Sequence, residues 1–301
     1  MPKSRVRTDL AIESAEYICG LRHKVPGVDI KEIQSDSTHI RVTHVHIKNQ
    51  EGENHIGKPV GRYITLETPY LADTDEDYHK EITKVLMEQL SILIPGISKK
   101  KVLVVGVGNR NITPDALGPE VVDHLLITRH LLLEYGRNKD FTKKLGMVSA
   151  IAPGVMAQTG MEGREVIAGV VKETSPDVLI VIDALAARSI SRLNTTIQLT
   201  DTGISPGAGV GNQRLGLNKK TLGIPVIAIG IPTVIDAATI VIDTFESLMG
   251  TLDAEEQEMF LQEVLTEELC SMFVTPKDID ETISKISFTI SEAINSLCHD
   301  F

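Results

Sequence analysis

The stretch KVLVVGVGNRNITPDALGPEVVDHLL, residues 101–126, sets the expected fold. It begins with a short apolar run rich in β-branched residues, which is typical of a strand buried on both faces. A loop that carries Asp115 follows, and from Pro119 the apolar residues take helical spacing. Similar apolar runs lie at 146–153, 177–185 and 224–232, and they alternate with helical patterns at 119–135, 161–174 and 234–249. This alternation predicts a mostly parallel sheet covered by helices.

The segments on either side of this alternation differ from it. Residues 28–68 alternate apolar and polar side chains around the Gly-containing segment 50–61, which predicts antiparallel strands joined by a loop, and 78–94 have helical spacing. Residues 254–300 predict two more helices, joined near Thr275 and Pro276, for which packing on the sheet is favoured over an oligomer interface. The sequence therefore predicts one α/β domain with a β-rich N-terminal elaboration.

Composition narrows the class of protein. The 301 residues are 42% hydrophobic and carry a net charge of -11, which argues against nonspecific binding of nucleic acid or anionic lipid. The three cysteines are far apart in the chain, so neither a disulfide framework nor a zinc knuckle is indicated. No signal-peptide core or membrane-spanning apolar run is present in the sequence, and we expect a cytoplasmic protein.

Three acids follow or end apolar runs, where the ligand crevice of an open α/β sheet lies. They are Asp115, Asp183 and Asp236. Asp236 is expected to cap a helix. Asp183 has apolar neighbours on both sides, so its carboxylate needs a partner: either a second carboxyl that shares a proton with it, or Arg188 in an ordinary ion pair. Asp115 is the candidate for the second carboxyl, because Pro114 and the following Gly-Pro hold it at the mouth of the sheet.

Other motifs give weaker signals. The segment 106–111 has two of the three glycines of a dinucleotide fingerprint. Segment 205–220 is rich in glycine, including Gly207 and Gly209, and is read either as a substrate-contacting loop or as a plain surface loop. Asp201-Thr202-Gly203 matches the triplet of pepsin-like proteases in one copy, but the all-β fold of those proteases conflicts with the pattern here.

Histidines bear on two further classes of enzyme. None occurs between His130 and His299, so the second half of the chain offers no histidine base for a Ser or Cys nucleophile. His44 and His46 share one face of a predicted strand, as a possible metal pair or as two solvated side chains. H-E-x-x-H is absent from the sequence, which argues against a zinc hydrolase of that type.

Several long motifs together resemble the germination protease of endospore-forming bacteria: RTDLAIE at 7–13, GNRNITPDALGP at 108–119, AIAPGVMAQTGMEGREVIAGVV at 150–171, VIDALAARS at 181–189, LTDTGISPGAGVGN at 199–212 and GIPVIAIGIPTVIDAATI at 223–240. The resemblance runs from about residue 6 to the C-terminus. It implies a fold similar to that of hydrogenase maturation proteases. It also implies a cytoplasmic endopeptidase of the spore core that initiates degradation of small acid-soluble spore proteins, without a cofactor.

The resemblance further implies a zymogen that loses a short N-terminal segment, a homotetramer and an atypical aspartic mechanism. The family's two catalytic aspartates fall on Asp115 and Asp183. Its substrates are cut after an acid in sequences similar to Thr8–Glu13, which gives residues 1–9 as propeptide, 10–301 as the peptidase domain, and self-processing between Asp9 and Leu10. Selectivity for acids implies basic groups near the cleft, and Arg188 is one candidate.

Two alternatives to this mechanism remain open. One is a metal-assisted peptidase, because hydrogenase maturation proteases bind a metal with acidic and His ligands at comparable sheet ends. The other is a noncatalytic binder of spore proteins that uses the glycine-rich loop around Gly207 and Gly209 to recognise its target.

Overall fold

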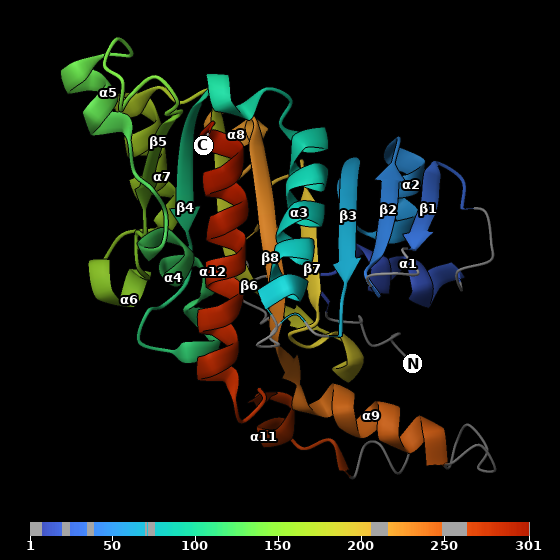
Figure 1. The fold of residues 1–301 in the computed structure, drawn as a ribbon. Helices are drawn as coiled ribbons and strands as arrows, with labels where there is room; N and C mark the ends of the chain where they lie inside the picture. Colours follow the sequence, from blue (N-terminus) through green and yellow to red (C-terminus); the bar gives the residue numbers. More distant parts are fainter. Residues whose placement is uncertain are drawn as a thin grey trace.

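A single mixed sheet organises the part of the chain that the computed structural model describes, namely residues 8–19, 25–34, 39–69, 71, 76–205, 216–248 and 264–300. Its strand order is β1-β2-β3-β7-β8-β6-β4-β5, and β9 pairs with the end of β8 (Figure 1). The strands are β1 (Val28–Gln34), β2 (Arg41–Ile47), β3 (Gly61–Glu67), β4 (Lys101–Gly106), β5 (Met147–Ile151), β6 (Val178–Ala187), β7 (Thr196–Thr200), β8 (Val226–Asp236) and β9 (Phe273–Val274).

The sheet has a parallel half and an antiparallel half. β5, β4, β6 and β8 run parallel to one another. β7, β3, β2 and β1 continue the same sheet as antiparallel strands. The predicted α/β fold with a β-rich N-terminal elaboration is thus confirmed, and that elaboration extends the central sheet.

Helices cover both faces of the sheet. The helices are α1 (Ala11–Cys19), α2 (Gln50–Ile56), α3 (Glu76–Leu93), α4 (Leu117–Asp123), α5 (Arg129–Tyr135), α6 (Met156–Thr159), α7 (Gly163–Thr174), α8 (Lys219–Leu222), α9 (Ala237–Leu248), α11 (Glu267–Cys270) and α12 (Ile279–Cys298). α3, α4 and α12 pack on one face of the central strands, and α7 packs on the other (Figure 1). As predicted, the last helix of the chain packs on the sheet, where Ile283, Ile286 and Ile290 are buried.

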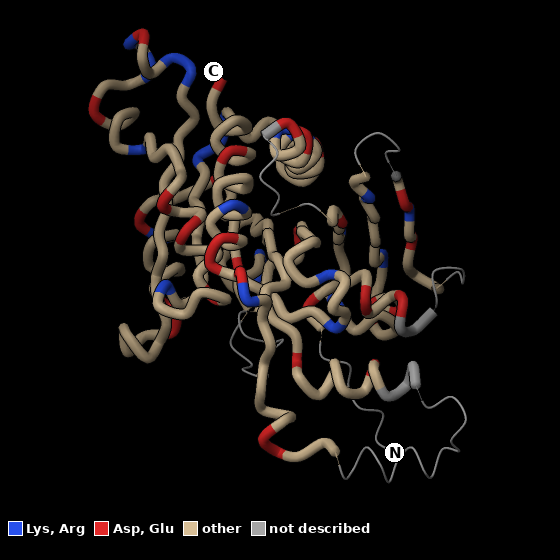
Figure 2. The backbone as a smooth tube through the Cα atoms, turned by 60° about the horizontal axis from the view of Figure 1, so that its bottom comes forward, with Lys and Arg blue, Asp and Glu red and all other residues tan. Residues whose placement is uncertain are grey.

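Charge is placed accordingly. Lys, Arg, Asp and Glu are sparse along the central strands and frequent on helices, loops and the outer strand β1 (Figure 2). Asp29, Lys31 and Glu32 are exposed on β1. Charged side chains on an edge strand disfavour pairing with another chain. Within the described residues, no helix combines the length and apolar character needed to cross a membrane.

Segment 50–61, predicted as a loop, contains helix α2, so that prediction is wrong. The side chain of Asn49 accepts a hydrogen bond from the Gly52 N–H at 3.0 Å and caps the start of the helix. Gly57, at φ 73°, ends it in the left-handed conformation. β3 begins four residues later, which places Lys58 in a short connection between helix and sheet.

The single helix predicted for 119–135 is two helices, α4 and α5. α4 begins at Leu117 and ends at Asp123, where the N–H groups of His124 and Leu125 close the last turn, and the groups beyond them contact α12. Asn295 accepts a hydrogen bond from the Leu126 N–H at 2.9 Å and donates one to the His124 carbonyl at 3.2 Å. A long-range contact therefore determines where the helix stops.

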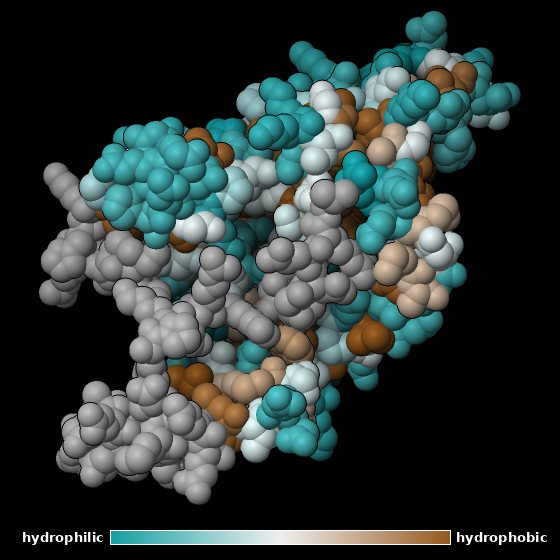
Figure 3. Space-filling model, turned by 180° about the vertical axis from the view of Figure 1, so that it is seen from behind, coloured by the Kyte–Doolittle hydropathy of each residue, from teal (hydrophilic) through white to brown (hydrophobic). Residues whose placement is uncertain are grey.

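The C-terminal pattern was also partly misread. The predicted junction near Thr275 and Pro276 is preceded by the short helix α11 and by β9, which pairs with Ile235 and Asp236 at the end of β8. Residues 254–263, in the first of the two predicted helices, lie outside the described residues. Seen from behind, apolar atoms are exposed over α9 at the foot of the molecule (Figure 3).

Candidate active site

Asp115 lies on the short 3-10 helix η2 (Thr113–Asp115), in the loop between β4 and α4. The backbone N–H of Asn109 donates to Asp115 Oδ2 at 2.8 Å. Thr233 on β8 donates to the Pro114 carbonyl at 2.6 Å, so a neighbouring strand fixes the loop. The carboxyl group is therefore held at the carboxyl end of the sheet, as predicted.

Glycine lets this loop approach the strands. A Cβ atom on Gly118 would lie 2.4 Å from the Val107 carbonyl oxygen and 2.6 Å from that of Ile182, well inside van der Waals contact. The Val107 N–H also donates to the Ile182 carbonyl at 2.9 Å. The start of α4 is thus seated against β6 at the residue that precedes Asp183.

Asp183 lies within β6 and not at its end, contrary to the prediction. β6 and β8 pair up to Ala187 and Ile235, whereas β4 ends at Gly106, opposite Ile182. Asp183 is consequently the first residue of β6 beyond the end of β4, and its side chain is 5% exposed. It lines a cavity of about 210 Å³ at this edge of the sheet.

The other walls of this cavity come from separate parts of the chain. Its lining includes Asp9 and Lys58 from the N-terminal region, Gln198 from β7, and Gly230 from β8. Gly230 is the register partner of both Asp183 and Gln198, so these two polar side chains stand on either side of it. The side chains of Asp183, Lys58 and Gln198 therefore line the same cavity as Asp9, which precedes α1.

Asp9 bonds to Ala186 on β6 in the way that a neighbouring strand would. Its N–H donates to the Ala186 carbonyl at 3.2 Å, and its Oδ2 accepts from the Ala186 N–H at 3.0 Å. Burial raises the pKa of Asp9, and the hydrogen bond from Ala186 and the charge of Lys58 oppose that rise. The next residue, Leu10, is 0% exposed and packs with Ile12 and Leu185.

The carbonyl oxygen of Asp9 receives two hydrogen bonds. Lys58 Nζ donates to it at 3.2 Å, and Gln198 Nε2 donates at 3.1 Å. Lys58 also donates to the Thr8 carbonyl at 2.9 Å, while the Ala11 N–H donates to Gln198 Oε1 at 2.6 Å. Burial lowers the pKa of Lys58, opposed by the negative charges nearby. Hydrogen bonds therefore hold the backbone on both sides of the peptide bond between Asp9 and Leu10.

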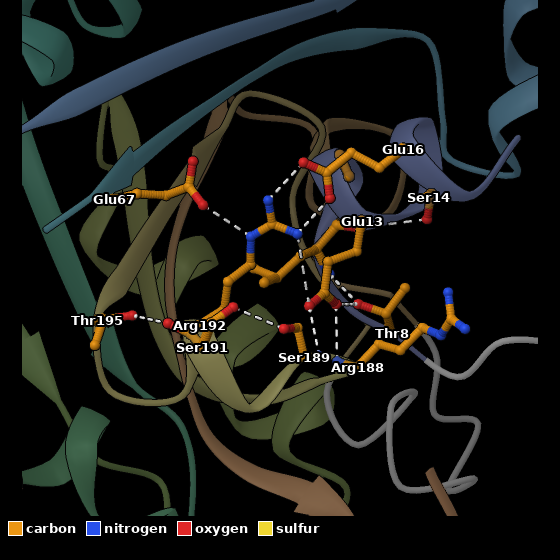
Figure 4. A network of polar contacts seen from close by, with 12 residues as sticks. Thr8, Glu13, Ser14, Glu16, Glu67, Arg188, Ser189, Ser191, Arg192 and Thr195 are labelled. Atoms are coloured by element: carbon orange, nitrogen blue, oxygen red, sulfur yellow. Dashed lines mark hydrogen bonds and ion pairs between the residues drawn. The ribbon is translucent and has the colours of Figure 1, made fainter. Parts of the chain in front are cut away.

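Glu13 lies in a network of polar contacts between α1 and the loop after β6 (Figure 4). Its carboxylate is 3% exposed and accepts the N–H groups of Arg188 and Ser189, each at 2.9 Å, and the hydroxyl of Thr8. Arg192 Nη1 lies 3.9 Å from Glu13 Oε1. Arg188, predicted to bind substrate through its charge, instead offers its backbone here, and its guanidinium lies 3.7 Å from Asp243.

Arg192 stabilises the wall behind Glu13. It donates to both oxygens of Glu16, at 2.5 and 2.7 Å, and to Glu67 on β3 at 2.9 Å. No motif in the sequence singles out Arg192, because its role depends on contacts with elements far from it in the chain. The network joins α1 to β3 and to the loop after β6, so it fixes the position of the N-terminal segment relative to the sheet (Figure 4).

The remaining predicted motifs have mostly structural roles. Asp201 accepts from the side chain and backbone of Arg62, at 2.7 and 2.8 Å, so the Asp-Thr-Gly triplet is part of a surface ion pair. Asp236 accepts the Ala238 N–H at 2.8 Å, which confirms its helix-capping role, although α9 begins at Ala237 and not at 234. Gly207 and Gly209 lie outside the described residues, so the prediction that they contact substrate remains open.

The two histidines on β2 share one face of the strand, as predicted. His44 is half-buried, burial lowers its pKa, and His46 is exposed. Among the described residues, no three His, Cys, Asp or Glu side chains lie together in a metal-binding arrangement.

Comparison with known proteins places the chain among proteases. A family model described as germination protease matches residues 8–249. The germination protease of Clostridium tetani is 44% identical, covering 96% of this chain and 94% of its own, and that of Bacillus subtilis is 37% identical, covering 98% and 94%. Among solved structures, the NiFe hydrogenase maturation protease HycI of Thermococcus kodakarensis matches with a TM-score of 0.38 at 17% identity, over 70% of this chain and 98% of its own.

Proposed function

Because the chain belongs to the germination protease family, and is therefore a peptidase, we propose that it is the endopeptidase that initiates degradation of small acid-soluble spore proteins during germination. We assign hydrolysis to Asp115 and Asp183. The observation that carries this assignment is that Asp183 lines the same cavity as Asp9, whose peptide carbonyl receives two hydrogen bonds there.

The proposed reaction is hydrolysis by a pair of carboxyl groups. One carboxylate removes a proton from water as the water oxygen attacks the carbonyl carbon, and the protonated partner donates to the leaving nitrogen. The C–N bond breaks, and the products are a new carboxyl group and a new amine. Burial of Asp183 and the position of Asp115 at the same end of the sheet support such a pair, although Asp115 is not among the residues that line the cavity. Two carboxyls brought to one site would separate into one acid and one base.

The chain is proposed to be a zymogen that removes residues 1–9 itself. Asp9 forms part of the cavity wall, and hydrogen bonds hold the backbone before and after the bond that follows it. This is the arrangement expected of an enzyme whose own N-terminal segment is its first substrate. While the segment is seated, it blocks the cavity to other peptides, which accounts for an inactive precursor even though the segment is short.

Cleavage after an acid has support in the same contacts. Asp9 occupies the position before the proposed cut, near Lys58, and the Glu13 carboxylate accepts hydrogen bonds from the N–H groups of Arg188 and Ser189. Backbone N–H groups favour a carboxylate without requiring a facing cation. Once residues 1–9 have left, the acid before the cut in a spore protein would make the contacts of Asp9, whereas Glu13 stays on α1 and keeps its own.

A homotetramer in the cytoplasm of the spore core is part of the proposal. The ends of β6 and β8 project beyond β4 together with β9, and large apolar side chains there, Ile190, Met272 and Val274, are exposed. Exposed apolar side chains near one projecting element suit a subunit contact. Sedimentation equilibrium would show a mass four times that of the chain, and a monomer at micromolar concentration would refute the assembly.

The test of the catalytic assignment uses chains made to begin at Leu10, so that no variant depends on self-processing, and a peptide with the sequence of residues 8–13 as substrate. Asp115→Asn and Asp183→Asn should each lower cleavage at least a thousandfold, because an amide can neither take the proton from water nor donate as an acid. Asp123→Asn, at an exposed acid paired with Arg110, is the matched control and should cleave normally. Cleavage by either active-site variant at the control rate would refute the assignment.

A chelator titration separates the metal-assisted alternative from the carboxyl pair. Activity that disappears with EDTA and returns with one divalent metal would favour the metal route, whereas the carboxyl pair predicts no change. The noncatalytic alternative conflicts with membership in a protease family, and it predicts spore-protein binding without any cleavage by the unmodified chain.

A further inference from the structure

The contacts of the Asp9 carbonyl suggest a role for two residues outside the aspartate pair. We propose that Lys58 and Gln198 form the oxyanion site of the peptidase, binding the carbonyl oxygen of the bond that is cut and stabilising the negative charge that forms on it. This inference rests on the proposed cleavage between Asp9 and Leu10. It adds two catalytic groups that touch the reacting carbonyl.

Both donors are aimed at one oxygen. Lys58 Nζ is 3.2 Å and Gln198 Nε2 is 3.1 Å from the Asp9 carbonyl oxygen. Hydrogen bonds of this length at a ground-state carbonyl shorten as charge develops on the oxygen, which is the geometry required for transition-state stabilisation. Two donors from different elements also define where the carbonyl must lie for the carbon to be attacked.

Gln198 is held rigidly for this task. It lies on β7, buried between β3 and β8, and its backbone pairs with Thr65 and Gly230. Its amide has a second contact, because Oε1 accepts the Ala11 N–H at 2.6 Å. One side chain therefore binds the carbonyl before the cut and the N–H two residues after the carbonyl. This fixes the amide orientation, with its NH₂ group toward the Asp9 oxygen.

Lys58 is fixed from the other side. It stands between Gly57, which ends α2 in the left-handed conformation, and Pro59, whose carbonyl accepts the hydroxyl of Tyr63 at 2.9 Å. Its ammonium group also binds the Thr8 carbonyl at 2.9 Å, so two successive carbonyls of the seated segment face one cation. A half-buried cation near the reacting carbonyl is worth more than the same charge in water.

The step is balanced as follows. Water adds its oxygen to the carbonyl carbon of Asp9 and gives one proton to the carboxylate that acts as base, while the carbonyl π electrons move onto the oxygen facing Lys58 and Gln198. These electrons then return to reform the C=O bond, and the C–N bond electrons leave with the nitrogen of Leu10. That nitrogen takes a proton from the acidic carboxyl. Lys58 and Gln198 keep their protons throughout and act only as hydrogen-bond donors.

The test measures self-processing of the full chain as a first-order rate. Lys58→Met removes the cation with little change in length, and Gln198→Glu keeps an acceptor for the Ala11 N–H but removes the amide donor. Each should slow the appearance of a chain starting at Leu10 by about a hundredfold or more, the effect typical of losing one oxyanion donor. Lys58→Arg should restore part of the rate. Lys48→Met and Gln50→Glu are matched controls on exposed positions and should process normally.

Two further measurements make every outcome decisive. Hydrogen exchange of the Ala11 amide reports whether the segment is still seated, and the thermal midpoint reports folding. Slow processing with a protected Ala11 amide and an unchanged midpoint supports the proposal. Processing at the normal rate, or slow processing with an exposed Ala11 amide, overturns it, because the residues would then be dispensable or mere anchors.

Failure of the proposed function would look different. If the unmodified chain is cut at another bond, or if Asp183→Asn processes normally, the proposed cleavage itself is wrong. If the unmodified chain is cut after Asp9 and Asp183→Asn is inactive while Lys58→Met and Gln198→Glu process normally, only the oxyanion site is refuted.

Discussion

Replacing Glu13 by glutamine should slow self-processing because it weakens the site that seats the N-terminal segment. The carboxylate accepts the N–H groups of Arg188 and Ser189 at 2.9 Å each, and it is 3% exposed. An amide of the same shape has one oxygen and one NH₂ group, so one of the two backbone N–H groups faces a donor and loses its partner. The fold around Arg192 remains, because Glu16 and Glu67 still bind the guanidinium.

The size of the effect follows from these contacts. A hydrogen bond to a charged acceptor contributes about 1.5–3 kcal/mol, and a buried donor left without a partner costs about 1–3 kcal/mol. The two figures describe one loss and are not summed. Since about 1.4 kcal/mol corresponds to a factor of ten in an equilibrium constant, the equilibrium constant for seating the segment should fall roughly tenfold to a hundredfold. The processing rate should fall equally if the segment then spends most of its time out of the cavity.

The assay follows the N-terminus by intact mass, with Glu16→Gln as the matched control in the same helix. That control loses contacts to Arg192 but leaves both N–H groups of Arg188 and Ser189 with Glu13. It should process within a few-fold of the unmodified chain. A Glu13→Gln chain that processes as fast as the Glu16→Gln chain would show that the two N–H groups do not seat the segment.

Three further predictions concern titration and packing. Burial raises the pKa of Asp9 above 3.8, so seating of the N-terminal segment is favoured below that pH and this gain is lost as pH rises through the raised pKa. Self-processing should therefore be faster in mild acid. Asp9→Asn should flatten the pH profile of seating, measured by hydrogen exchange of the Ala11 amide. Gly118→Ala should destabilise the fold by about 1–3 kcal/mol in a denaturant titration and lower peptide cleavage, because its Cβ would meet two carbonyl oxygens; an unchanged midpoint would contradict this close approach. Arg192→Met should cost about 1.5–3 kcal/mol in the same titration, because it removes the charged donor shared by Glu16 and Glu67 while Arg41 still pairs with Glu67, and an unchanged midpoint would show that the network is not coupled to folding.

The strand and helix alternation could be read from the sequence because it depends on local apolar spacing. The placement of Asp183 shows both the success and the limit of that reading. Its position after an apolar run correctly indicated the active edge of the sheet, but β6 continues past it because β8 offers a partner up to Ile235. Asp183 reaches the edge of the sheet because the neighbouring strand β4 ends at Gly106, opposite Ile182. The apolar spacing within one strand does not show where its neighbour ends.

The capping residues of α2 are local signals for that helix. Asn49 and Gly57 are ordinary capping residues for α2, and reading them together would have predicted that helix in place of a loop. Lys58 and Gln198 could not be found in this way, because their importance depends on where the Asp9 carbonyl lies. Gln198 stands at a polar position of the alternating pattern TIQLT, which does not distinguish it from Thr196 and Thr200.

The most direct test of the central claim is the mass of the N-terminal product from the full chain and from its Asp183→Asn variant, incubated side by side in mild acid. The account predicts that the unmodified chain loses residues 1–9 and begins at Leu10, and that the variant keeps its original N-terminus. A variant that also begins at Leu10, formed at the same rate, would contradict the claim that this carboxyl group takes part in cutting the bond after Asp9.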